Sequence, residues 1–174
     1  TNVSANMPGL PVWGTIRHID ASYFDAGTCY IAVDAHYVGD FGSYVYKTTD
    51  FGATWKRLEL NLPANNSNFV NQIKEDPDKQ GLLWLGTEKS LYFSPNDGKD
   101  WIHLKNNLPP VPIFGIEIQR NFKLAVFDKV HNEFTVLRVQ RRLCATDDSE
   151  EQRSKLLPIR AVVGHWGFLG RFVG

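Results

Sequence analysis

Two carboxylates, Asp34 and Glu88, are the residues of this sequence best suited to catalysis. Asp34 ends the strand-like segment Tyr-Ile-Ala-Val-Asp, and Glu88 ends a similar segment, Trp-Leu-Gly-Thr-Glu. Two carboxyl groups at a suitable separation can act as a general acid and as a nucleophile or base, which is the chemistry of glycoside hydrolysis. We therefore predict Asp34 and Glu88 as candidate catalytic residues. The alternative is that each is a polar residue that begins an exposed loop.

The segment after Asp34 carries side chains suited to binding. Asp34 and Thr48 are 14 residues apart, whereas Glu88 and Ser94 are only 6 apart. The extra residues, 36–43, combine aromatic, acidic and imidazole groups with glycines, and surface loops of this composition suit sugar stacking or contact with a peptide. The predicted ligand-binding residues are His36, Tyr37 and Phe41. Simple variation in loop length is the alternative.

The elements that must position these residues repeat along the chain. Residues 48–55 read Thr-Thr-Asp-Phe-Gly-Ala-Thr-Trp, and residues 94–101, which begin 46 positions later, read Ser-Pro-Asn-Asp-Gly-Lys-Asp-Trp. In such an octet, an Asp or Asn side chain can accept hydrogen bonds from backbone N–H groups one or two residues on, Gly supplies a positive φ, and Trp enters a core. The predicted structural residues are Thr48, Asp50, Gly52, Trp55, Ser94, Asn96, Gly98 and Trp101.

One turn in every 40–50 residues is typical of β-propeller blades. Strand-like segments flank each octet, and four fit into each period. The predicted fold is all-β, a propeller fragment with two complete four-stranded blades and a partial third. The predicted divisions are a linker or the end of a preceding blade (1–13), blade 1 (14–62), blade 2 (63–109), a partial blade 3 (110–140) and an unassigned tail (141–174).

The octets resemble the Asp box, also called the bacterial neuraminidase repeat. The first copy matches that pattern fully, and the second has Asn96 for Asp and Asp100 for Thr. With Gly-Leu-Pro-Val-Trp-Gly at 9–14 and Asn-Leu-Pro-Pro-Val-Pro at 107–112, residues 7–122 resemble large bacterial propellers described as sortilin-like or glycosyl-hydrolase-like. In Asp-box glycosidases that cut xyloglucan, a similar second-strand Asp belongs to the acid/base pair, and Asp34 is the matching position.

This resemblance implies two functions. One is a carbohydrate-active or carbohydrate-binding module that is similar to glycosyl hydrolases, with a polysaccharide ligand and a secreted or periplasmic location. The other is a non-catalytic, sortilin-like scaffold that binds a peptide or protein. In both, the remaining blades of a longer parent chain are expected partners. The Asp-box carboxylates are expected to brace turns rather than to act in catalysis, because a catalytic group is needed once and the octet recurs.

Composition and spacing exclude other functions. Acidic and basic residues are equal in number, 19 each, which removes the positive surface expected of a nucleic-acid-binding protein. No apolar run is long enough for a membrane span. The histidines lack metal-ligand spacing, and Asp50 and Asn96 lie outside any calcium-loop pattern, so we predict neither a metal nor another cofactor.

The match to the family pattern fails in the third repeat. Strands are expected from Ile113 and Leu124, but Phe127–Glu133 departs from the family pattern, and nothing after Leu137 is recognisable. Two explanations stay open for this stretch: a diverged closing segment, or a change of reading frame in the source sequence.

Overall fold

The computed structural model describes residues 2–63, 68–104, 110–119, 123–128 and 133–138. Within them, eleven strands and two short 3-10 helices follow one another along the chain. The elements are η1 (Ser4–Asn6), β1 (Thr15–Ala21), β2 (Cys29–Ala35), η2 (His36–Val38), β3 (Asp40–Thr48), β4 (Lys56–Arg57), β5 (Val70–Glu75), β6 (Leu83–Thr87), β7 (Leu91–Ser94), β8 (Ile102–His103), β9 (Ile113–Gln119), β10 (Lys123–Asp128) and β11 (Glu133–Arg138).

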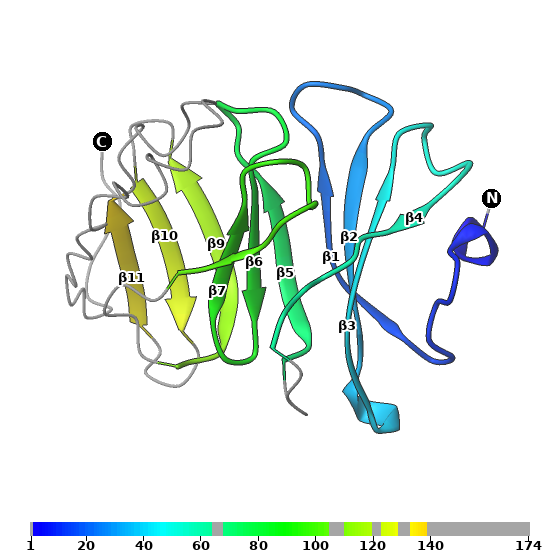
Figure 1. Ribbon diagram of the computed structural model, residues 1–174, viewed down its shortest axis with the longest axis horizontal. Coiled ribbons are helices and arrows are strands. Elements are labelled where there is room, and N and C mark those ends of the chain that lie inside the picture. The colour runs from blue at the N-terminus through cyan, green and yellow to red at the C-terminus, as the bar shows by residue number, and fades with distance from the viewer. Residues whose placement is uncertain (1, 64–67, 105–109, 120–122, 129–132, 139–174) are drawn as a thin grey trace, which may run out of the picture.

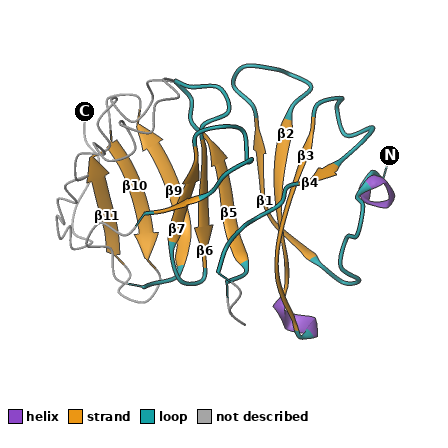
Figure 2. Ribbon diagram, viewed as in Figure 1, coloured by secondary structure: helices purple, strands orange, loops and turns teal. Residues whose placement is uncertain are grey.

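The strands form three antiparallel sheets that stand side by side (Figure 1). We call them sheet 1 (β1–β4), sheet 2 (β5–β8) and sheet 3 (β9–β11). In each sheet the strands follow chain order, and the first strands of neighbouring sheets, β1, β5 and β9, pack in sequence. Almost all of the described secondary structure is strand (Figure 2). The predicted fold class, an all-β fragment of a β-propeller with two complete four-stranded blades and a partial third, is confirmed.

Each central strand is apolar on both faces because each sheet is packed on both sides. Alternate residues of β2 therefore enter different cores: Tyr30 and Ala32 lie between sheets 1 and 2, whereas Ile31 and Val33 face the segment that precedes β1. A further core, which includes Trp84 of β6, lies between sheets 2 and 3.

The strand register shows that sheets 1 and 2 are repeats with one insertion. Ile31 pairs with Tyr46 in sheet 1, and Leu85 pairs with Tyr92 in sheet 2. The two sheets are thus related by 54 residues in their first two strands and by 46 in their last two. The difference is the eight extra residues after Asp34.

The blade boundaries stay a prediction, since the sheets locate the strands and not the limits of each repeat. No helix in the described part of the chain is long and apolar enough to cross a membrane. The predicted tail, 141–174, lies outside the described residues.

Candidate ligand-binding site

Asp34 and Glu88 lie at the same end of sheets 1 and 2. The register gives them equivalent places, because Val33 of β2 pairs with Tyr44 and Thr87 of β6 bonds to Ser90, each pair just before the connection to the third strand. We call this the hairpin end. The opposite end of the two sheets carries both octets and is called the octet end.

A β-bulge occurs in the first strand of each sheet at the hairpin end. The register shifts between Ile16 and His18 in β1, and between Val70 and Gln72 in β5, so that Arg17 and Asn71 are the bulged residues. A bulge re-aims the side chain of the extra residue, and bulges are frequent beside functional sites. Here the two bulged side chains meet: Nη2 of Arg17 donates to Oδ1 of Asn71 at 3.4 Å.

Asp34 is fully buried and its carboxylate oxygens are occupied. The backbone N–H of His36 donates to Oδ1 at 2.9 Å, and Nδ1 of His36 lies 2.7 Å from Oδ1 and 2.6 Å from Oδ2. Nε of Arg17 is 3.4 Å from Oδ2. Because a carboxylate only accepts hydrogen bonds, Nδ1 is the protonated nitrogen of His36. This environment is that of a structural brace at the start of the connection that follows β2.

Glu88 has a different environment although its position is equivalent. It follows β6 in a two-residue turn, and its side chain is partly exposed. Its Oε2 accepts a hydrogen bond from Nδ2 of Asn71 at 3.2 Å. A continuous chain of polar contacts therefore runs from Asp34 through Arg17 and Asn71 to Glu88, across the boundary between sheets 1 and 2. Sequence spacing did not identify Arg17 or Asn71; only the shared register shift does.

Residues 36–43 form an extended hairpin rather than the predicted loop. A single 3-10 turn (η2) and Gly39, with φ 82°, reverse the chain, and β3 begins at Asp40. Asp40 stabilises the return strand by accepting from the N–H of Gly42 at 2.9 Å and from the hydroxyl of Tyr44 at 2.7 Å. The hydrogen bond from the Tyr44 hydroxyl to Asp40 is the main reason why the pKa of Tyr44 is raised. The extension is thus a braced element.

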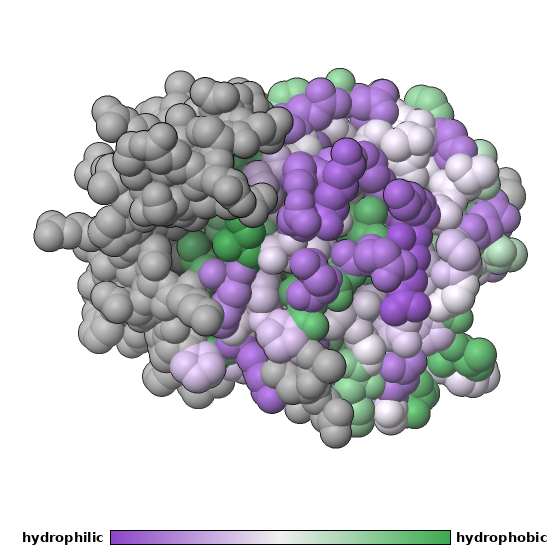
Figure 3. Space-filling view, viewed as in Figure 1, coloured by the Kyte–Doolittle hydropathy of each residue, from purple (hydrophilic) through white to green (hydrophobic). Residues whose placement is uncertain are grey.

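The predicted ligand-binding residues lie on this hairpin. Tyr37 is 76% exposed and Phe41 is 45% exposed. The ring of His36 stacks on Phe69 at 4.5 Å and contacts the ring of Tyr37 at 3.9 Å. Phe69 precedes β5, so this stack joins the hairpin to sheet 2. In Figure 3, hydrophobic residues reach the surface at the lower right, where the hairpin and the segment before β1 both lie, whereas the middle of the face is mostly hydrophilic.

The first octet closes the β3–β4 turn with a small network of hydrogen bonds. The hydroxyl of Thr48 accepts from the N–H of Gly52 at 3.0 Å and donates to Oδ1 of Asp50 at 2.8 Å. Asp50 also accepts from the N–H of Thr54 at 2.8 Å and from its hydroxyl at 2.6 Å. The Thr54 bonds lower the pKa of Asp50. The carboxylate reaches an N–H four residues on, so the predicted reach of one or two residues is wrong.

The second octet makes the same network with one hydrogen bond reversed. Ser94 accepts from the N–H of Gly98 at 2.8 Å, and Asn96 Oδ1 accepts from the N–H of Asp100 at 2.9 Å. Here Nδ2 of Asn96 donates to Oδ2 of Asp100 at 2.7 Å. In the first octet the third residue accepts from the seventh, whereas in the second it donates to the seventh. The Asn96 and Asp100 substitutions therefore compensate for each other.

Both octets place two consecutive residues in the left-handed region. Gly52 and Gly98 have φ of 86° and 80°, as predicted, and the preceding Phe51 and Asp97 have φ of 58° and 61°. Of the closing tryptophans, Trp101 is buried between sheets 1 and 2. Trp55 is only partly buried, against the core formed with the segment before β1. The octets thus hold equivalent places in neighbouring sheets, far from the hairpin end.

Three antiparallel sheets packed face to face, with repeated turns at one end and repeated bulges at the other, define an arc of a β-propeller. No protein-family model and no curated protein matches the chain. In the described ranges, no cluster of His, Cys, Asp and Glu could hold a metal ion.

Solved propeller structures do resemble the chain. An ancestral GH74 enzyme has 20% identity and a TM-score of 0.54, over 66% of this chain and 14% of that chain. The GH74 xyloglucanase from Xanthomonas campestris has 16% identity and a TM-score of 0.50, over 70% and 22%. YCF48 bound to D1 peptide has 14% identity and a TM-score of 0.50, over 71% and 36%. The chain spans 14–36% of the lengths of these proteins, and at this identity they share its fold.

Proposed function

We propose that the protein is a carbohydrate-binding β-propeller whose ligand contacts the hairpin end of sheets 1 and 2. The observation that carries this proposal is the exposure of Tyr37 and Phe41 on a braced hairpin beside the polar chain that ends at Glu88. Exposed aromatic rings stack on the apolar faces of sugar rings, and nearby polar groups bind hydroxyls. Such a role is consistent with a secreted or periplasmic location, which stays a prediction.

Binding is favoured over hydrolysis for the described residues. A catalytic acid or nucleophile must reach the reacting atoms, and Asp34 is fully buried with its oxygens bonded to His36 and Arg17. Catalysis by Asp34 and Glu88 stays a prediction. A peptide ligand is the second candidate function; it is supported by the similarity of the fold to that of YCF48, whose structure contains a D1 peptide.

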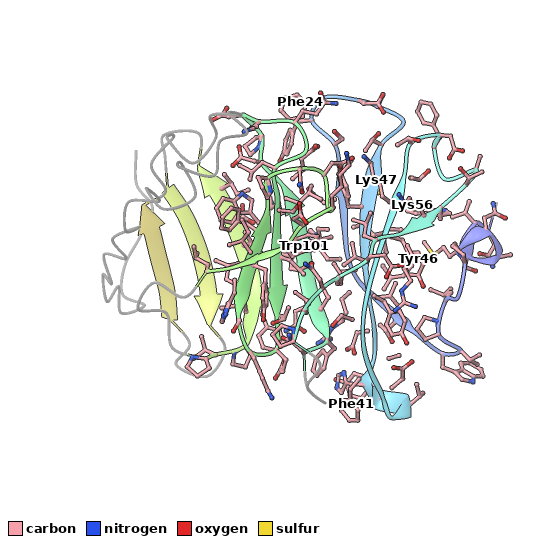
Figure 4. All side chains as sticks on the ribbon, in the orientation of Figure 1. Phe24, Phe41, Tyr46, Lys47, Lys56 and Trp101 are labelled. Carbon is pink, nitrogen blue, oxygen red and sulfur yellow. The ribbon has the colours of Figure 1, made fainter. Side chains whose placement is uncertain are left out.

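The test compares aromatic residues at the two ends of the sheets. Tyr37→Ala and Phe41→Ala should each weaken binding to a soluble neutral polysaccharide such as xyloglucan, measured by calorimetry, by roughly 5- to 30-fold. Phe24→Ala is the matched control, because Phe24 is 42% exposed against 45% for Phe41. Phe24 and Phe41 lie at opposite ends of the molecule in Figure 4.

Two results would contradict the proposal. One is equal loss of binding in the Phe24 and Phe41 variants, which would indicate contacts away from the hairpin end. The other is the absence of binding to a broad set of polysaccharides. If an extended peptide library then bound the protein and Tyr37→Ala reduced that binding, the peptide-binding scaffold would replace the carbohydrate proposal.

A further inference from the structure

We propose that Glu88 is the hydrogen-bond acceptor for a ligand hydroxyl, and that Arg17, from the neighbouring sheet, positions Glu88 through Asn71. This inference rests on the proposed carbohydrate function and deepens it. It assigns a ligand-contacting residue and a positioning residue, and it states which ligand group is recognised: a hydroxyl that donates.

The direction of the polar chain is fixed at Arg17. A guanidinium only donates hydrogen bonds, so Asn71 must present its carbonyl oxygen to Nη2 of Arg17. The amide nitrogen of Asn71 is thereby directed to Oε2 of Glu88. If the amide flipped, its oxygen would face the carboxylate, and two acceptors would oppose each other. Arg17 therefore sets the orientation in which Asn71 holds Glu88.

Of Asp34 and Glu88, only Glu88 has a carboxylate oxygen available to a ligand. The two oxygens of Asp34 are occupied and its side chain is fully buried. The Glu88 side chain is partly exposed, its Oε2 is bonded to Asn71, and its Oε1 makes no hydrogen bond within the residues that the structure describes. Since an ionised carboxylate accepts and cannot donate, the group that fits Oε1 is a donor such as a sugar hydroxyl.

The choice of a hydroxyl gives the proposal a measurable signature. An O-methylated sugar keeps its ether oxygen as an acceptor but has lost the donor, so a free acceptor in the site must discriminate against it. In Glu88→Gln, the amide oxygen takes the hydrogen bond from Asn71, and the amide NH₂ group faces the ligand instead. The variant thus replaces an acceptor with a donor at nearly the same volume.

The experiment measures the affinity of the full protein for a β-linked gluco-oligosaccharide and for its O-methylated form. Wild type should prefer the hydroxylated form by roughly tenfold or more, since hydrogen bonds to charged groups are strong. Glu88→Gln should lose this preference. Arg17→Gln should reduce it about threefold without any change at Glu88. Lys56→Gln, which also removes a positive charge but on the outer strand β4, should leave it unchanged.

Three other outcomes would overturn part or all of this proposal. Tyr37-dependent binding with an unchanged preference in Glu88→Gln would overturn the role of Glu88 and leave the proposed function intact. A preference lost in Glu88→Gln but unchanged in Arg17→Gln would overturn the positioning role of Arg17. If wild type bound neither form, the proposed function and this inference would both be wrong. Circular dichroism and melting temperature confirm that each variant is folded.

Discussion

Single residues in the two octets show that what is repeated is a hydrogen-bond pattern rather than a set of identities. Asp50 accepts from Thr54, whereas Asn96 donates to Asp100, and both pairs link the third residue of the octet to the seventh. The first and fifth residues form the same bond in both copies. A substitution in one partner of the pair is therefore tolerated only with a matching change in the other.

The pairing predicts a rescue by double substitution. Asn96→Asp should lower the free energy of unfolding by about 1 kcal/mol, because it removes the donor to Asp100 and sets two carboxylates against each other. Adding Asp100→Thr should restore stability, since the pair then matches that of the first octet. Urea denaturation measures both. Additive losses in the double variant would show that the two residues are not coupled.

At the scale of elements, the hairpin at the end of β2 distinguishes sheet 1 from sheet 2. In sheet 2, Thr87 and Ser90 bond across a two-residue turn at 2.9 Å. In sheet 1, the same connection is lengthened by a 3-10 turn and an extension of β3, and it is held by Asp40 and by the stack of His36 on Phe69. The core register on either side is unchanged, so the hairpin is an addition to a complete sheet.

Replacing the hairpin should separate folding from binding. A variant in which Glu-Lys replaces residues 34–43 would give sheet 1 the turn of sheet 2. Its stability should change by only about 1 kcal/mol, because the lost stacking is offset by a shorter loop, but polysaccharide binding should disappear. Urea unfolding and calorimetry measure the two effects. Binding retained at wild-type strength would place the ligand elsewhere.

The strands were predictable from sequence, and the site was so only in part. A strand was predicted from Ile113, where β9 begins, because apolar runs and turn residues are local signals. The continuation of β3 back to Asp40 was missed, since polar and glycine residues suggest a loop until the braces by Asp40 are seen. Arg17 and Asn71 could not be predicted as neighbours, because their contact depends on bulges in two separate sheets.

At the scale of the whole molecule, stability resides in the contacts between sheets. The core between sheets 1 and 2 includes Tyr30, Leu58 and Trp101. Gly98 permits this packing, since a Cβ at that position would lie 2.8 Å from Leu58. On the other side of sheet 1, a Cβ added at Gly52 would lie 3.7 Å from Val3, so the segment before β1 takes the place that a neighbouring sheet takes elsewhere. The equivalent glycines Gly98 and Gly52 therefore pack against different elements: Gly98 against sheet 1, and Gly52 against the segment before β1.

The two closing tryptophans should differ in their contribution to stability. Trp101→Ala should lower the free energy of unfolding by about 3–5 kcal/mol, because the side chain is buried between two sheets. Trp55→Ala should cost less, about 1–3 kcal/mol, since Trp55 is only partly buried. Urea denaturation followed by circular dichroism measures both changes. Equal costs would indicate that the segment before β1 packs as firmly as a sheet.

The left-handed backbone at the fourth octet position bears on how the two repeats can diverge over evolutionary time. Phe51 adopts φ of 58° with a side chain that is 80% exposed. Asp97 adopts φ of 61° but bonds to the hydroxyl of Tyr30 and to Nζ of Lys47. Selection for stability would therefore replace Phe51 with Gly or Asn, which tolerate this conformation, whereas Asp97 is retained by its partners. The fourth position should therefore change readily in the first octet and slowly in the second.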